Sequence, residues 1–429
     1  MLEPFFQEVG DLVNTDPKAW PLEFSSNSHL IYSSPATLSF NSPGAEGFGV
    51  KRAALTLPDS VMLLFSPGCC GRNTSALGGP ESHYGKRTYY LLLDETDIVT
   101  GRYLPRILEA AKEIVALAKP KVLILCSTCV VALLGTDMER LCREIKASCQ
   151  VEALAATMYA LTREGHLPPM VLVRKTLYSL LKKAPKRADT VNILGFFTPL
   201  NDQCELYSLL AKVGLKHIYE LSRMTSLESY QAMAQANFNL VLHPEARYAA
   251  NYLKDTLEIP AIELLRTFQL SKITKQYQLL SQILEVNFNL EPYLERATKE
   301  VEEFSSKFKG LNLALSDGVN GNPWDLTLTI QALGLNVKEI FAEVTSQDLP
   351  WLKAIAKLSP HTKIYSNLHP SMLGYVSSTK IDIALGKAAR YYHPKAYGFD
   401  FTSETQPFGY QGLQQLLKEL EGVAHARSI

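Results

Sequence analysis

Four cysteines that follow two apolar runs are the residues whose types and spacing indicate chemistry. Val61–Phe65 is followed by Ser-Pro-Gly and then by Cys69 and Cys70, and a second apolar run leads into Cys126-x-x-Cys129. Four thiolates can hold a [4Fe–4S] cluster or a structural zinc ion. Because a vicinal cysteine pair is poorly shaped to chelate one zinc ion, the pattern favours an iron–sulfur cluster, most simply [4Fe–4S], with a larger cluster left open.

Other roles for these thiols compete with ligation. Free cysteine is among the most buried residue types, and Cys126 ends an apolar run, so a core thiol is a real alternative there. A redox pair at Cys126-x-x-Cys129 is a further alternative, although the aromatic and proline context of thioredoxin-like motifs is missing. Cys69 and Cys129, each beside a glycine or a hydroxyl residue after a strand, are the strongest ligand candidates.

The remaining cysteines and four histidines are weaker candidates. Cys142, Cys149 and Cys204 lie in helical contexts and are expected to be ordinary core thiols. The histidines stand in a loop near the cysteines or close to predicted strand ends, where they could reach a substrate, although a lone histidine is more often structural. These are His83, His243, His369 and His393.

The elements that must position the cysteines follow from the apolar pattern. A run without alternation is typical of a strand covered on both faces, as in a parallel sheet. A helix predicted from Leu104 to Leu117 stops at Lys119-Pro120 and leads into the strand that ends at Cys126. Ser127 and Thr128 are expected to cap a following helix, whose N-terminus would lower a thiol pKa. The cysteines would then lie beyond the carboxyl ends of parallel strands, where open α/β sheets bind ligands.

Strand–helix alternation recurs in three sections of the 429-residue chain. We therefore predict an α/β fold of three Rossmann-like domains with parallel sheets around a central crevice. The predicted divisions are an N-terminal arm at 1–40, a first domain at 41–190 carrying the cysteine site, a second at 191–300 with connecting helices, and a third at 301–429.

Composition narrows the class of protein. Lys plus Arg and Asp plus Glu both count 43, so nothing indicates a nucleic-acid or anionic-membrane partner. The first residues contain no apolar run long enough for a signal peptide or a membrane span, which predicts a cytoplasmic protein without disulfides. The chain has no Gly-x-x-x-x-Gly-Lys-Ser/Thr phosphate loop, so it should not hydrolyse ATP itself.

Several segments, taken in order, resemble the nitrogenase component 1 family, which contains the catalytic subunits of nitrogenase and of related tetrapyrrole reductases. The resemblance covers most of the chain from about residue 40. The segments are Ser66-Pro67-Gly68-Cys69, Asp97–Gly101, Ser127-Thr128-Cys129 with Leu134–Asp137, Val191–Gly195, Lys387, and Gly409-Tyr410-x-Gly412.

This resemblance implies a reductase subunit. It would take electrons from a separate ATP-hydrolysing iron protein and pass them through an iron–sulfur cluster to a small-molecule substrate in the crevice, with a tetrapyrrole as one candidate. The subunit would pair with itself or with a homologous subunit. Because the family-matching positions supply only Cys69 and Cys129, two copies would complete the four ligands of one shared cluster. Alternatively, Cys70 and Cys126 complete a site within one chain.

Departures from the family limit the chemistry. No cysteine occurs in Ser42–Ala45, where members with an eight-iron cluster have one. No cysteine follows Cys204 and no histidine occurs at 401–408, where nitrogenase holds its active-site metallocluster, so dinitrogen reduction is not indicated. Two rival hypotheses are a non-catalytic scaffold for metallocluster assembly and an α/β binding protein without a metal.

Overall fold

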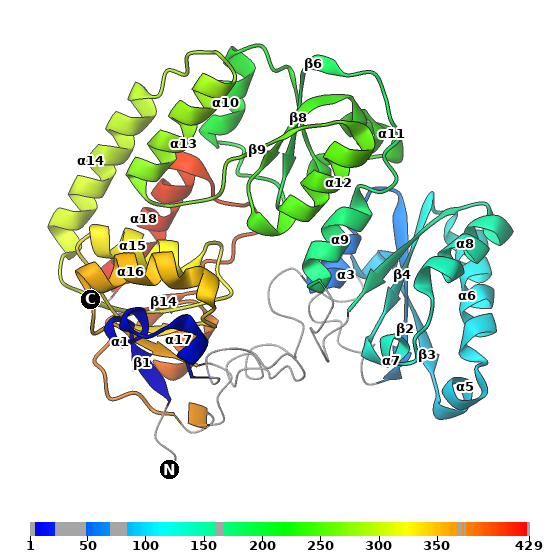
Figure 1. Ribbon diagram of the computed structural model, residues 1–429, viewed down its shortest axis with the longest axis horizontal. Helices are drawn as coiled ribbons and strands as arrows, with labels where there is room; N and C mark the ends of the chain where they lie inside the picture. Colours follow the sequence, from blue (N-terminus) through cyan, green and yellow to red (C-terminus); the bar gives the residue numbers. More distant parts are fainter. Residues whose placement is uncertain are drawn as a thin grey trace. The chain divides into compact units, whose positions relative to one another are not determined.

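The computed structural model describes residues 5–21, 49–68, 84–158, 167–366, 371–372 and 375–426 (Figure 1). The described residues of Gly44–Thr198 and Leu215–Leu265 form one compact unit. Those of Met1–Pro43, Pro199–Gly214 and Arg266–Ile429 form a second. Three sheets build the two units, two sheets in the former and one in the latter.

The first sheet has the strand order β3-β2-β4-β5, and all its strands are parallel. Its strands are β2 (Ser60–Pro67), β3 (Thr88–Leu93), β4 (Val122–Ser127) and β5 (Glu152–Thr157). Its helices are α3 (Gly49–Ala54), α5 (Glu95–Thr100), α6 (Tyr103–Ala118), α7 (Cys129–Leu133), α8 (Met138–Cys149) and α9 (Pro169–Leu177).

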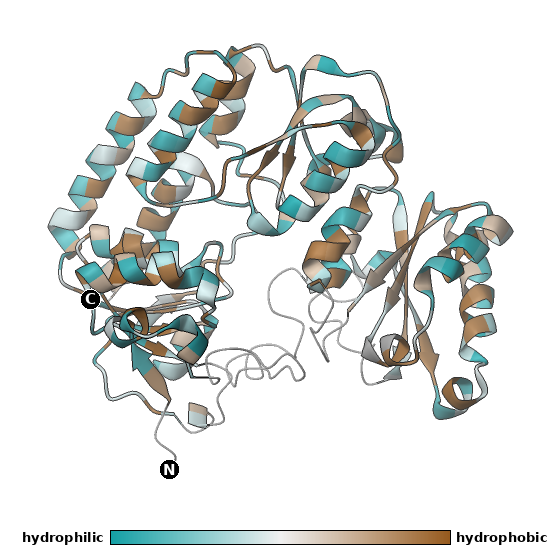
Figure 2. Ribbon diagram, in the orientation of Figure 1, coloured by the Kyte–Doolittle hydropathy of each residue, from teal (hydrophilic) through white to brown (hydrophobic). Residues whose placement is uncertain are grey.

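Burial on both faces explains the unbroken apolar runs of β2 and β4. Leu63 and Phe65 pack with α6 and α8, whereas Met62 and Leu64 point to the opposite face and pack with α3 and α9. Figure 2 shows the strands of this sheet coloured largely as hydrophobic. The predicted parallel sheet is therefore confirmed here.

Local signals set the helix boundaries before β4. Asp94 accepts a hydrogen bond from the Asp97 amide at 2.7 Å and caps α5. Gly101, at φ 72°, separates α5 from α6. Lys119 adopts a left-handed conformation at φ 45°, and α6 ends before it, as the Lys119-Pro120 sequence predicted.

The second sheet has the order β7-β6-β8-β9 and is also parallel. Its elements are β6 (Arg187–Leu194), β7 (His217–Glu220), α11 (Leu227–Gln231), β8 (Ala236–Val241), α12 (Arg247–Leu257) and β9 (Ala261–Glu263). Arg174 of α9 is buried and connects α9 with residues that follow β6 and β8. Its guanidinium donates a hydrogen bond to the Gly195 carbonyl at 3.2 Å and forms an ion pair with Glu245 at 2.5 Å.

The third sheet has the order β1-β12-β11-β10-β13-β14. Its strands are β1 (Phe6–Glu8), β10 (Asn312–Ser316), β11 (Asn336–Phe341), β12 (Lys363–Tyr365), β13 (Ile383–Leu385) and β14 (Tyr397–Phe399). The helices of this unit are α1 (Val9–Asn14), α10 (Glu205–Lys212), α13 (Leu270–Ile283), α14 (Glu291–Phe308), α15 (Pro323–Ala332), α16 (Leu349–Leu358), α17 (Lys387–Tyr392) and α18 (Gly409–Ala426).

The N-terminal residues contribute to this third sheet. β1 pairs antiparallel with β12, while the other pairings are parallel. The sequence predicted only an arm at 1–40, because a three-residue strand is too short to show a periodic pattern. The predicted α/β fold is confirmed, with two parallel sheets and a third that is parallel except at β1; the boundaries at 41, 191 and 301 stay predictions.

Candidate functional site

The two cysteine-bearing segments leave the first sheet at the same edge. β2 and β4 are neighbouring parallel strands, with Phe65 opposite Ser127. After β2, Gly68 is the last described residue before Cys69 and Cys70, which lie outside the described residues. After β4, Cys129 is the first residue of α7. The adjacent parallel strands β2 and β4 therefore agree with the prediction that both segments follow carboxyl strand ends of one sheet.

Cys126 has a different environment from the strand edge. It lies inside β4 opposite Leu64, is fully buried, and belongs to the apolar cluster between the sheet, α3 and α9. Burial raises the pKa of the Cys126 thiol to about 12, although the charge of Lys51 on α3 opposes the rise. Burial also lowers the pKa of Lys51. At neutral pH this environment favours a protonated thiol, whereas ligation requires a thiolate.

Two hydroxyl groups directly before Cys129 are buried and lack partners. Ser127 and Thr128 are 1% and 4% exposed, and neither hydroxyl oxygen has a hydrogen-bond partner among the described residues. Thr128 directly precedes α7, but neither hydroxyl makes a cap hydrogen bond, so the expectation that they cap this helix is wrong. A buried hydroxyl without a partner costs about 1–3 kcal/mol. Hydroxyl groups can donate hydrogen bonds to cluster sulfur atoms, so Ser127 and Thr128 are chemically compatible with an iron–sulfur cluster held by Cys129.

Exposed apolar side chains occur just after Cys129 and along β3. Leu133 and Leu134, just after Cys129, are 64% and 42% exposed. Tyr90 and Leu92 project from β3, the edge strand of the sheet, and are also exposed. Exposed leucines next to a candidate ligand are compatible with a surface that another chain covers.

The other described cysteines behave as core thiols. Cys142 and Cys149 of α8 pack against the apolar cluster on the α6 side of the first sheet, and burial raises the pKa of Cys142 to about 12. Cys204 is buried next to α10 and lies 3.8 Å from the Phe408 carbonyl. Over the described ranges, no three His, Cys, Asp or Glu side chains gather as metal ligands would.

The described histidines have structural partners. His243 follows β8, and its Nδ1 accepts the Glu245 amide at 3.3 Å. His393 is buried, and its Nε2 lies 2.7 Å from the Glu339 carboxylate. Neither arrangement supports a substrate contact. His83 and His369 lie outside the described residues.

Glu339 is a buried carboxylate that the sequence analysis did not single out. It lies on β11 and is fully buried. Burial pushes its pKa up, but hydrogen bonds, led by that from His393, lower the pKa of Glu339 below its ordinary value. Tyr365 and Ser377 also donate to its Oε1, at 3.3 and 3.1 Å. Residues two apart in a strand point to the same face, so the apolar Val337 on β11 was the sequence signal that Glu339 is buried.

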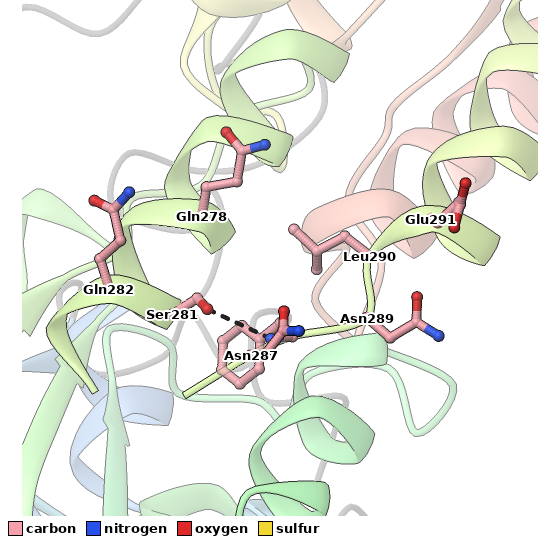
Figure 3. Close-up of a pocket in the computed structure, with 8 residues that line it drawn as sticks. Gln278, Ser281, Gln282, Asn287, Asn289, Leu290 and Glu291 are labelled. Carbon is pink, nitrogen blue, oxygen red and sulfur yellow. Dashed lines mark hydrogen bonds between the residues drawn. The ribbon is translucent and has the colours of Figure 1, made fainter. Parts of the chain in front are cut away.

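A polar hollow of about 580 Å³ lies in the second unit, where α13 leads into α14 (Figure 3). The Ser281 hydroxyl, which lines the hollow, accepts a hydrogen bond from the Phe288 amide at 3.4 Å. Four of its eight lining residues carry uncharged amides, and none is a cysteine or a histidine. Its lining residues are Gln278, Ser281, Gln282, Asn287, Phe288, Asn289, Leu290 and Glu291.

The first sheet has the open, parallel α/β architecture in which ligands commonly bind beyond the carboxyl ends of the strands. The profile of the nitrogenase component 1 type oxidoreductases matches residues 46–424, so the chain belongs to that family. None of the helices in the described residues is long and apolar enough to cross a membrane.

Individual relatives are distant. The chain is 24% identical over 320 residues to the nitrogenase iron-molybdenum cofactor biosynthesis protein NifE of Methanosarcina barkeri, a match covering 67% of each. It is 25% identical over 205 residues to one of the subunits of light-independent protochlorophyllide reductase from a Synechococcus species, covering 43% of this chain and 40% of that one. The solved structure of nitrogenase Cp1 at pH 6.5 shares its fold, with a TM-score of 0.71, 15% identity and 97% of each chain covered.

Proposed function

We propose that this chain is a nitrogenase-like reductase subunit that receives electrons through an iron–sulfur cluster and passes them to a small-molecule substrate. The observation that carries the proposal is the position of the Cys69 and Cys129 segments, which leave adjacent parallel strands of the first sheet at one edge. Membership of an oxidoreductase family supports the reaction class. When bound, the cluster supplies one-electron transfer.

Cys69 and Cys129 are the proposed ligands, and the four-iron cluster is shared between two copies of this chain or between this chain and a homologous subunit. A cubane cluster takes about four protein thiolates, twice the number that these positions supply per chain. The buried, protonated environment of Cys126 supports this ranking over a site completed by Cys70 and Cys126 within one chain. The exposed side chains of Leu133 and Leu134 support a subunit interface at the same edge.

The proposed electron donor is a separate ATP-hydrolysing iron protein. The chain lacks the phosphate loop that ATP hydrolysis requires, so nucleotide chemistry must come from the partner. A tetrapyrrole is the proposed substrate class, because one relative belongs to a protochlorophyllide reductase. The balanced charge of the chain is compatible with the proposal that it has no nucleic-acid partner. A cytoplasmic location is proposed as well, and none of the described helices could span a membrane.

A second candidate is a scaffold on which a metallocluster is assembled and then released. It is favoured by the similarity to NifE, a cofactor biosynthesis protein.

Anaerobic purification with iron and sulfide analysis, combined with native mass spectrometry, tests the cluster. A dimer with about two irons per chain is expected for one shared [4Fe–4S] cluster. Iron-free protein after reconstitution would refute both functions, and four irons on a monomer would refute the shared site.

Cysteine variants test the ligands. Cys69→Ala and Cys129→Ala should each abolish the visible iron–sulfur absorption while circular dichroism stays unchanged. Cys142→Ala is the matched control, because it removes a half-buried helix thiol from the same unit. Full iron content in both test variants would exclude the ligand roles.

Turnover separates the two functions. The reductase should consume protochlorophyllide, followed by its visible absorption, only with an iron protein and ATP. The scaffold should instead transfer its iron to an apo-acceptor protein without consuming a substrate.

A further inference from the structure

A second polar hollow, of about 590 Å³, is formed by the turn before α10 together with α14 and α18, all in the unit that contains the third sheet (Figure 1). Pockets of about 300–1,000 Å³ typically hold small ligands. Five of its eight lining residues carry carboxamides, two are cations and one is a glutamate, so its chemistry suits a polar ligand. The lining residues are Asn201, Gln203, Arg296, Gln411, Gln414, Gln415, Lys418 and Glu419.

Two of these carboxamides have an oxygen without a partner. The Oε1 atoms of Gln411 and Gln415 are buried, and neither accepts a hydrogen bond from a described residue. The two residues are one helical turn apart, so they lie on the same face of α18. Native proteins rarely leave such acceptors unpaired. Because the last torsion of a glutamine side chain is soft, a small rotation turns each oxygen toward a donor in the hollow.

Contacts with the surrounding unit hold both glutamines in place. The Gln411 backbone amide donates to Glu205 Oε2 at 3.1 Å. The Gln415 Nε2 donates to Glu419 Oε1, also at 3.1 Å, which leaves the oxygen of this carboxamide as the atom that needs a partner. A site whose groups already hold their positions loses little conformational freedom when its ligand arrives. The two oxygens are therefore prepared to accept hydrogen bonds from hydroxyl or amine groups.

Two cations of the same hollow indicate the charge of the ligand. Arg296 uses its Nε for an ion pair with Glu300 at 3.0 Å, and its two Nη groups have no partner in the described part of the chain. Lys418 is exposed and makes no ion pair with any described residue. Guanidinium and ammonium groups form strong hydrogen bonds with phosphate and carboxylate oxygens. The lining thus offers acceptors on α18 and donors for one anionic group.

Hydroxyl groups both donate and accept hydrogen bonds, as carboxamides do, so a ligand with several hydroxyls matches the five amides. We propose that this hollow binds a small polyhydroxylated ligand with one anionic group, of which a sugar phosphate is the simplest example. Gln411 and Gln415 accept hydrogen bonds from the ligand hydroxyls, while Arg296 and Lys418 bind its anionic group. The site belongs to a different unit from the strand ends that precede the cysteines, and it needs no iron.

Isothermal titration calorimetry of the full chain at fixed ionic strength tests the ligand class. Glucose 6-phosphate and gluconate carry hydroxyls with an anionic group, whereas glucose has only the hydroxyls and inorganic phosphate only the charge. We expect saturable binding of one molecule per chain for at least one of the first two probes. Its affinity should exceed those of glucose and of inorganic phosphate by about tenfold or more. The tighter of the two shows whether the anionic group is a phosphate or a carboxylate.

Single variants locate the binding in the hollow. Gln411→Leu and Gln415→Leu remove the two acceptors and should each weaken binding of the tighter probe by about tenfold. Lys418→Gln should weaken binding of that probe without changing the affinity for glucose. The matched control is Lys307→Gln, which removes a cation of α14 that lies outside the hollow and pairs with Glu421 of α18 at 3.4 Å. It should bind as wild type does, and circular dichroism should show the same fold in all variants.

Three results would overturn the inference. The absence of saturable binding for both glucose 6-phosphate and gluconate would exclude the ligand class. Inorganic phosphate that binds as tightly as these probes would reduce the site to surface cations. Wild-type affinity in Gln411→Leu, Gln415→Leu and Lys418→Gln would place the binding elsewhere; because Lys418 is exposed, its variant keeps this test decisive even if a glutamine variant fails to fold. None of these results bears on the proposed function, since the titrations are made without iron.

Discussion

Replacing Glu205 with alanine should strongly destabilise the unit that contains the third sheet, because this carboxylate holds the start of α18. Glu205 is the first residue of α10 and is 3% exposed. Its Oε1 accepts the Tyr277 hydroxyl and the Tyr410 amide, each at 2.7 Å, and its Oε2 accepts the Gln411 amide at 3.1 Å. The carboxylate therefore satisfies two of the amides that a helix N-terminus leaves without intrahelical partners.

The magnitude follows from the three donors that lose their acceptor. Each unsatisfied buried donor costs about 1–3 kcal/mol, and water entering the vacated space recovers part of this. We expect Glu205→Ala to lower the free energy of unfolding by about 3–5 kcal/mol. Glu205→Gln keeps the oxygen that Tyr277 and Tyr410 use and loses the acceptor of the Gln411 amide, so about 1–2 kcal/mol is expected.

The effect should depend on pH. Burial raises the pKa of Glu205 above its usual value, although hydrogen bonds from Tyr277 and the α18 amides oppose the rise. The folded state thus binds the proton more tightly than the unfolded state, and the stability from this group falls as pH rises from the ordinary glutamate pKa through the folded one. Glu205→Gln lacks this titration, so its deficit relative to wild type should be largest near pH 4 and shrink toward neutrality.

Urea unfolding combined with peptide-level hydrogen exchange over 405–415 measures the change where it occurs. The matched control is Glu300→Ala on α14 of the same unit, which removes a surface pair with Arg296 at 3.0 Å and should cost less than about 0.5 kcal/mol. A Glu205→Ala deficit no larger than that of Glu300→Ala would refute the reasoning, as would unchanged exchange protection of the Tyr410 and Gln411 amides.

Three further outcomes are expected. Gly195→Ala should lower the free energy of unfolding by about 1–3 kcal/mol, because Gly195 has φ 145° and a Cβ there would lie 2.9 Å from the His243 amide nitrogen. Gly422 has open space around it, so Gly422→Ala should not destabilise the protein in the same urea assay. Cys126 is fully buried and its pKa is raised to about 12, so it should resist iodoacetamide at pH 8 until urea is added. The half-buried Cys149 should react earlier. Rapid labelling of Cys126 in the native protein, detected by mass spectrometry, would contradict its placement. Substrate reduction should stop when the iron protein is omitted, and an equal rate with a chemical donor alone would exclude obligate docking.

The sequence alone was enough to predict the sheet that carries the candidate site. Unbroken apolar runs at β2 and β4 can only be buried on both faces, and the helix before Lys119-Pro120 has the length to join parallel strands. These properties are local, so a short stretch of sequence is enough to predict them. The resemblance then linked the Cys69 and Cys129 segments to one family, and the family match confirms that link.

Only the tertiary structure decided which groups meet. The alignment of Phe65 with Ser127 places two strand ends at one edge. The packing of α3 and α9 encloses Cys126, and the buried Ser127 hydroxyl has no hydrogen-bond partner among the described residues. Glu205 meets α18 across more than 200 residues of sequence, and β1 pairs with β12 across the chain. Such contacts depend on the register and packing of distant segments, whose energies no local pattern of residue types encodes.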